Sequence, residues 1–240
     1  MKMIKKSFLL IFFAALSSSG FASLDSEAFS LGVSAGPAIS WDFTGYGVGL
    51  NLGYTVEQKH TFEVEFLYMH LDAKSKNYDR SSYFPSAKTT VERRDSYKSE
   101  LDEYFLFLNY RYTDSLPFLN TQRFHYYYGL GVGMRRLFAK TDGTENYQAV
   151  IRRGKAVGVS RRTISGSHKE SETNAAGQIF AGLKFDLTES VSMSFGGRGI
   201  FSKAYQPTGV ALRNAVRQGN LNIKSSSFTG MLEAGVTLRW

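Results

Sequence analysis

The chain has 240 residues, no cysteine, a formal net charge of +8 and 42% hydrophobic residues. The lack of cysteine excludes disulfide frameworks and thiolate metal sites, and the shortness of the apolar runs excludes a bundle of transmembrane helices. Aromatic residues make up 15% of the chain, and 23 glycines stand against 4 prolines. This composition excludes disordered and collagen-like classes and favours strands over helices.

Residues 1–22 have the features of a secretory signal peptide. Three lysines precede an apolar segment that is too short to span a bilayer as a helix, and small residues end at Ala22. We expect cleavage after Ala22, which leaves residues 23–240 as a single domain with a formal charge of +5. The alternative, an N-terminal membrane anchor, is disfavoured by the short apolar core.

Eight segments of the remaining chain alternate apolar residues with small or polar ones. In residues 46–54, every even position is apolar and every odd position is glycine or Asn51. Because side chains alternate faces along a strand, each segment has one apolar face and one polar face. In chain order the segments begin near Phe29, Tyr46, Phe62, Tyr104, Tyr126, Ile179, Val191 and Leu232. Their lengths, about 9–11 residues, match tilted strands that cross a bilayer.

Two further patterns indicate a membrane barrel rather than a soluble β-sandwich. Aromatic residues cluster at segment ends, as at membrane–water boundaries. The connections also differ in length: residues 37–44 are moderate, 55–61, 113–122 and 188–190 are shorter, and 71–103, 137–177 and 202–230 are long. We therefore predict an all-β fold, a transmembrane antiparallel up-and-down β-barrel of eight strands, with long extracellular loops and periplasmic termini.

The C-terminal segment alternates apolar residues up to a final aromatic, Leu232-x-Ala234-x-Val236-x-Leu238-x-Trp240. With the eight-segment pattern, this ending resembles the small eight-stranded outer-membrane barrels of Gram-negative bacteria, such as the membrane domain of outer membrane protein A. The resemblance covers residues 23–240, although phenylalanine is the commoner last residue there. It implies a location in the cell outer membrane and recognition of Val236, Leu238 and Trp240 by the barrel insertion machinery. We also expect a monomer in contact with outer-membrane lipids, including lipopolysaccharide.

The inward faces of the expected strands carry both signs of charge. Position parity places these residues inside: Glu63, Glu65, Arg111, Arg135, Lys184, Asp186, Arg198, Glu233 and Arg239. We expect a lumen ionic network that plugs the barrel, with Arg198 and Glu233 paired because their strands should be neighbours. The alternative is a wet interior with scattered polar residues.

Glycines alternate along two of the segments, at positions 45–49 and 129–133. Their spacing does not fit the dinucleotide fingerprint, which also needs a following helix. We expect them to leave room in a narrow lumen for Phe105, Phe107, Tyr127 and Arg135. We therefore expect no cofactor.

The expected outer loops carry an excess of basic residues. One stretch, residues 151–162, holds five basic residues and no acidic one: Arg152, Arg153, Lys155, Arg161 and Arg162. A basic loop at the outer face would meet phosphates of the outer leaflet and other surface polyanions. The alternative is a plain solvated loop, and the compartment argues against nucleic acid as a partner.

No catalytic set stands out in the sequence. The four histidines fit no metal-binding spacing. His168, Glu170 and Ser171 lie close together in sequence, but adjacency is not the geometry of a catalytic triad. We expect a structural or surface-interaction role rather than an enzyme. The alternatives are a narrow ion pore and, less favoured, a lipid-modifying enzyme.

Overall fold

The computed structural model describes residues 27–41, 43–73, 76–84, 89–116, 123–153, 156–205 and 227–240. Within these ranges there are nine strands: β1 (Glu27–Ser40), β2 (Phe43–Val56), β3 (His60–Ala73), β4 (Lys76–Phe84), β5 (Thr89–Ser115), β6 (Phe124–Arg153), β7 (Ala156–Asp186), β8 (Val191–Ser202) and β9 (Phe228–Arg239). No helix in these ranges is long and apolar enough to cross a membrane. The expected signal peptide, residues 1–22, lies outside the described residues.

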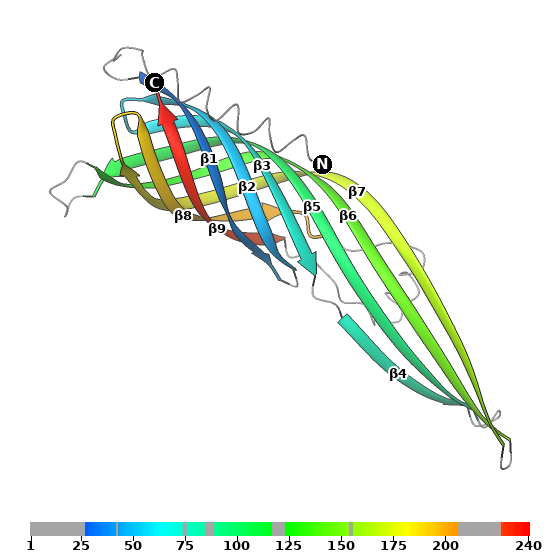
Figure 1. Ribbon diagram of the computed structural model, residues 1–240. Helices are drawn as coiled ribbons and strands as arrows, with labels where there is room; N and C mark the ends of the chain where they lie inside the picture. The colour runs from blue at the N-terminus through cyan, green and yellow to red at the C-terminus, as the bar shows by residue number, and fades with distance from the viewer. Residues whose placement is uncertain are drawn as a thin grey trace, which may run out of the picture.

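Eight of the strands close into an antiparallel barrel (Figure 1). The hydrogen-bonded order is β3-β2-β1-β9-β8-β7-β6-β5, and β3 also pairs with β5, which completes the ring. The first and last strands meet, because β1 pairs with β9. The expected eight-stranded up-and-down barrel is therefore confirmed. Closure pairs the backbone groups of every barrel strand, as a bilayer requires.

The barrel wall exposes apolar side chains and buries polar ones. On β3, Phe62, Val64 and Phe66 are exposed, whereas Glu63 and Glu65 are buried. The same alternation runs along β2. An apolar outer surface is stable where lipid rather than water surrounds the barrel. The alternation in the sequence thus fixes which face of each strand meets lipid.

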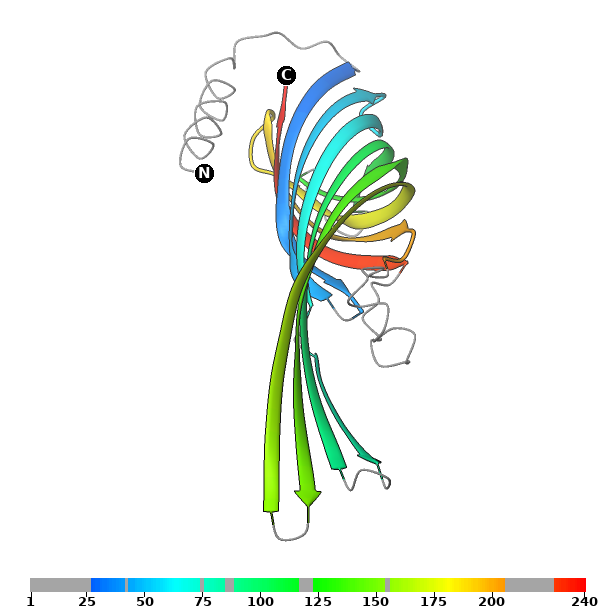
Figure 2. The same cartoon turned by 90° about the vertical axis from the view of Figure 1, so that its right-hand side faces the viewer.

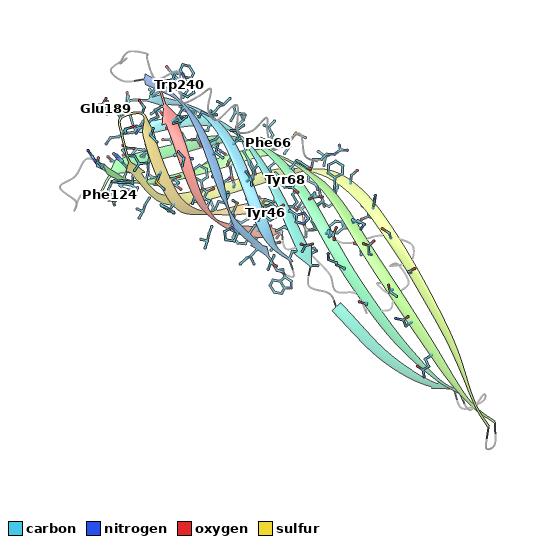
Figure 3. All side chains as sticks on the ribbon, in the orientation of Figure 1. Tyr46, Phe66, Tyr68, Phe124, Glu189 and Trp240 are labelled. Atoms are coloured by element: carbon cyan, nitrogen blue, oxygen red, sulfur yellow. The ribbon has the colours of Figure 1, made fainter. Side chains whose placement is uncertain are left out.

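Aromatic side chains mark both ends of the apolar outer surface. At the end from which the longest strands depart, the ring of Tyr68 lies 6.4 Å from that of Tyr46 and 5.1 Å from that of Tyr104 (Figure 3). At the opposite end, the rings of Tyr112 and Tyr128 are 5.3 Å apart. Amphipathic tyrosine rings suit the two membrane–water boundaries.

Three barrel strands continue far beyond the barrel rim. β5, β6 and β7 have 27, 30 and 31 residues, whereas the other barrel strands have 12 or 14. Together with β4 they form a four-stranded sheet, here called the extension, that projects from one end of the barrel (Figures 1 and 2). The expectation that residues 71–103 and 137–177 are loops is wrong. The described residues of these ranges form the end of β3, all of β4 and the outer parts of β5, β6 and β7.

The strands of the extension could not be predicted from the sequence, because apolar residues do not line either face of the sheet. Residues 140–148, within β6, read Lys-Thr-Asp-Gly-Thr-Glu-Asn-Tyr-Gln and show no alternation. The backbone ladder nevertheless continues without a break, from Phe124 opposite Phe185 to Arg153 opposite Ala156. Strand pairing that begins in the barrel therefore propagates into water.

The first outer connection is also shorter than expected. β1 and β2 stay paired up to Ser40 opposite Phe43. Trp41, at the turn, has a φ of 41°, a left-handed conformation that tight turns require. Most of residues 37–44 is thus strand and not loop. The last connection is described only at its two ends, because residues 206–226 lie outside the described residues.

The barrel should fold without the extension, because the ladder of each strand pair is complete below the rim. We would replace residues 75–97 and 144–165 each by an Asn-Gly turn, which suits a two-residue hairpin connection. The shortened chain should still migrate differently on gels before and after boiling, as a folded barrel does. Identical migration, with the full chain still showing the difference, would contradict an independent barrel.

Candidate functional site

The middle of the lumen holds one arginine between two glutamates. Arg198 Nη1 donates to Glu65 Oε1 at 2.7 Å, and Arg198 Nε donates to Glu233 Oε2 at 2.9 Å. Arg198 Nη2 makes a further contact with Glu233. All three side chains are at most 6% exposed. The structure thus brings together the pair that parity and strand order suggested, and adds a second acid.

This cluster spans the barrel. Arg198 lies on β8 and Glu65 on β3, and these strands are four places apart in a ring of eight. They therefore form opposite walls of the lumen. The Arg198–Glu65 ion pair crosses the interior, whereas Glu233 lies on β9, beside Arg198.

Two amide side chains complete the hydrogen bonding. Gln178 Nε2 donates to Glu65 Oε2 at 2.7 Å and to Asn109 Oδ1 at 2.8 Å. Asn109 Nδ2 donates to Glu65 Oε2 at 2.9 Å, and Gln178 Oε1 accepts from Arg198 Nη1 at 3.1 Å. A buried charge is tolerated where it is paired and its remaining polar atoms are bonded. Sequence analysis missed both amides, although they share the inward parity of the charged residues.

A second ion pair lies on the side of this cluster that faces away from the extension. Arg111 Nη2 is 3.1 Å from Glu63 Oε2, and the Arg111 guanidinium lies 4.9 Å from the centre of the Tyr127 ring. A Cβ at Gly182 or Gly196 would collide with the Tyr127 hydroxyl. Tyr127 therefore gains its room in the narrow lumen from these two glycines, and not from the glycines at 45–49 and 129–133 that were expected to provide it.

The mouth of the lumen opposite the extension gathers three basic side chains around Asp186. Asp186 Oδ1 is 2.7 Å from Arg239 Nη2 and 3.6 Å from Lys184 Nζ, and Asp186 Oδ2 is 2.9 Å from His125 Nε2. These side chains are 15–28% exposed, so this mouth is wetter than the centre. Lys184 therefore lies away from the central cluster, in a separate group.

A third ion pair lies near the outer rim. Arg135, only 1% exposed, places Nη1 at 3.1 Å from Glu103 Oε1 and donates to Ser202 Oγ at 2.9 Å. Its Nη2 donates to the backbone oxygen of Lys203 at 2.7 Å. Glu103 was assigned to a loop from the sequence, so its pairing with Arg135 was missed. Extending the inward parity of Phe105 and Phe107 by one step would have found it.

An apolar layer separates the central cluster from this outer pair. The inward residues of β5 run Glu103, Phe105, Phe107, Asn109, so two phenylalanines lie between the two polar layers. Their rings stack at 5.4 Å, and they belong to one cluster of fully buried apolar side chains with Leu67, Met69, Ile200 and Met231. The sequence placed Phe105 and Phe107 in the lumen, but it was not read as predicting a separate apolar layer. The signal was present on β3, where the inward residues change from glutamate to leucine and methionine.

Residues 203–205 fold over the outer mouth of the lumen. Tyr205 is 3% exposed and joins the apolar cluster, while Lys203 forms an ion pair with Glu172 of β7. Lys203 holds the pKa of Glu172 below its usual range. Burial, with Glu170 nearby, raises the pKa of the Tyr205 hydroxyl above its usual range.

The other candidate residues lie outside the lumen. Arg152 and Arg153 end β6, and Arg161 and Arg162 lie in β7, which places them in the distal hairpin of the extension (Figure 1). Their side chains, and the whole of Lys155, lie outside the described part of the chain.

The C-terminal residues complete the strand pairing of the barrel. Val236 and Leu238 lie in β9 opposite Val33 and Leu31 of β1. Trp240 and Phe29 exchange two backbone hydrogen bonds of 3.1 Å. The last residue therefore joins the two ends of the barrel chain.

The residues considered for catalysis do not form a set. Glu170 pairs with Ala139, which is buried, and Ser171 with Phe138, which is exposed, so Glu170 and Ser171 lie on opposite faces of β7. The side chain of His168 is outside the described part. Among the side chains that are described, no three His, Asp or Glu residues are grouped as in a metal site.

We expect substitutions of different residues in the central cluster to lower the stability of the barrel by different amounts. Arg198→Gln leaves two buried carboxylates without their cation and should lower the free energy of unfolding by about 3–5 kcal/mol. Glu233→Gln keeps the Arg198–Glu65 pair and should cost clearly less. Chemical unfolding of the folded barrel measures both, and the double variant completes a cycle. Equal losses that add strictly would contradict the shared cluster.

Comparison with known proteins gives structural neighbours without a sequence family. No family model and no curated protein matches the chain. Three solved structures resemble it over most of their length. Neisserial surface protein A is 14% identical, with 89% of this chain and 97% of that chain covered and a TM-score of 0.43. A major outer membrane protein from Thermus thermophilus is 11% identical, with 90% and 100% covered and a TM-score of 0.47.

The third is Ail, the attachment invasion locus protein of Yersinia pestis, in complex with the heparin analogue sucrose octasulfate. It is 11% identical, with 90% and 100% covered and a TM-score of 0.35. Strand order, closure and the exposed apolar outer surface are features of this chain itself. By these features the chain is a transmembrane β-barrel of the small, eight-stranded outer-membrane type.

Proposed function

We propose that this outer-membrane barrel is a non-conducting anchor that holds the extension at the cell surface for interaction with other surfaces. The observation that carries the proposal is the Arg198–Glu65 ion pair, which joins opposite walls of the lumen. An interior already crossed by a paired charge has little room for a hydrated ion. An eight-stranded barrel is normally filled by its own side chains.

The stacking of layers supports a plugged lumen. An ion entering from the periplasmic mouth would meet the Asp186 group, then the Arg111–Glu63 pair, and then the Arg198 cluster. It would next have to cross the apolar layer around Phe107, which offers no polar partner and excludes water. A charged layer followed by an apolar layer would block an ion in two different ways, which favours a structural role over a pore.

The extension supports the surface-interaction part of the proposal. Four polar strands project well beyond the rim, and the basic residues Arg152, Arg153, Arg161 and Arg162 lie in their distal hairpin (Figure 2). A basic tip held away from the bilayer would attract surface polyanions. Outer-membrane lipids, including lipopolysaccharide, would surround the barrel, which we take to be a monomer made after removal of residues 1–22.

The plug is tested by single-channel recording of the purified barrel in a planar bilayer. The wild-type protein should show no steady conductance. A triple variant, Glu65→Ala with Phe107→Ala and Arg198→Ala, removes the charge bridge and part of the apolar layer, and should open a measurable one. Large steady currents from the wild type, unchanged in the variant, would contradict a plugged lumen and favour the ion pore.

The C-terminal residue gives a separate prediction about assembly. Trp240→Asp places a charge at the boundary where the two ends of the barrel chain pair, and it removes the final aromatic. The folded fraction recovered from outer membranes, read by the gel shift on boiling, should fall severalfold. Trp41→Asp is the matched control, because Trp41 is 81% exposed in a turn at the other end. Equal recovery of both variants would contradict a special role for Trp240.

A further inference from the structure

The outer surface of the barrel carries an arginine at the upper edge of its apolar band. Arg136 is exposed on β6 and comes directly after Met134 on the lipid-facing side, where Met134 is 59% exposed. On β5 its pairing partner is Tyr104, one of the tyrosines of the outer boundary. Arg136 therefore lies at the height where acyl chains give way to head groups.

The contacts of Arg136 orient its guanidinium group but do not neutralise its charge. Its Nη1 donates to Thr173 Oγ1 at 3.3 Å, and its guanidinium lies 5.3 Å from the centre of the Phe138 ring. Among the described side chains, no carboxylate forms an ion pair with Arg136. Asp102, which is opposite Phe138 on β5, already accepts from Tyr68 and His70, 2.7 and 2.8 Å away. The arginine thus keeps an uncompensated charge.

A second cation and two aromatic rings lie near Arg136 on the outer surface. Lys169 lies on the same face of β7, four residues further from the barrel than Thr173, and is exposed. Phe138 is 44% exposed and meets Tyr104 edge-on at 5.8 Å. Two strands further round the barrel, β8 and β9 present Phe201 and Phe228. Arg136 and Lys169 therefore place positive charge on the β6–β7 side, whereas β8 and β9 have these two aromatic rings.

We propose that Arg136, with the Thr173 hydroxyl, binds the phosphate of an outer-leaflet lipid, and that the rings of Phe138 and Tyr104 pack beside its head group. The guanidinium presents a planar fork of donors that suits phosphate oxygens. The lipid's acyl chains continue down the apolar wall past Met134. Lys169 raises the positive potential at the same site. The inference depends on the proposed orientation, with the extension at the cell surface.

The test uses the purified full chain in detergent micelles, first shown to be folded by its gel shift on boiling. Native mass spectrometry would measure binding of a bis-phosphorylated glycolipid and of the same lipid after removal of its phosphates. Arg136→Gln should weaken binding of the phosphorylated lipid by about tenfold, the scale of one charge-assisted contact. Arg136→Lys should lie between, and binding of the dephosphorylated lipid should not change.

Lys98→Gln is the matched control, because Lys98 is exposed on the neighbouring strand and already paired with Glu100 at 2.7 Å. It should bind as the wild type does, and millimolar inorganic phosphate should not displace the lipid. Unchanged binding by Arg136→Gln, or an equal loss in Lys98→Gln, would overturn the site. A chain that shows no gel shift would instead refute the barrel placement on which the inference depends, so the two failures are distinguishable.

Discussion

The lumen of a closed eight-stranded barrel is too narrow to leave charges unpaired, and this constraint organises the interior. Arg198 meets it by bonding to carboxylates from two strands, one of them on the opposite wall. Gln178 and Asn109 then bond the polar atoms that the ion pair leaves over. Removing one member of such a cluster lowers the stability of the fold, because the remaining charges stay buried without a partner.

The same constraint explains the order of layers along the lumen. Where inward residues are charged they pair, as Arg111 with Glu63 and Arg135 with Glu103. Where no pairing is possible, the inward residues become apolar, as in the layer around Phe107. Glycine appears opposite the largest side chains, since a Cβ at Gly133 would lie 2.8 Å from Phe107. The inward side chains thus complement one another in both volume and charge.

The strands that face lipid could be predicted from the sequence, whereas the strands that face water on both sides could not. Alternation identified the barrel strands because one face of each must be apolar in a bilayer. Neighbouring strands made Arg198 and Glu233 a reasonable pair. Glu65 as the second partner depended on the register around the whole ring, which no local pattern reveals. Beyond the rim both faces of the strands meet water, so β4 and the outer parts of β5, β6 and β7 left no periodic signal.

The extension and the proposed plug are consistent with the proposed role of the barrel as an anchor. A sheet of long strands that leaves the membrane needs a rigid base, and the Arg198–Glu65 ion pair holds opposite walls of that base together. The ladder from β6 to β7 runs from barrel to tip without interruption, so continuous strand pairing joins the extension to its base. A wide, water-filled lumen would supply no such cross-links.

The most direct test of a dry, charge-bridged lumen is the rate at which the Arg198 Nε proton exchanges with water. NMR of the folded barrel in micelles, with selectively labelled arginine, would resolve this proton from those of exposed residues such as Arg136. The structure predicts strong protection, because Nε–H is bonded to Glu233 and the side chain is 3% exposed. Exchange as fast as that of Arg136 would mean that water reaches the centre and would contradict the plugged barrel.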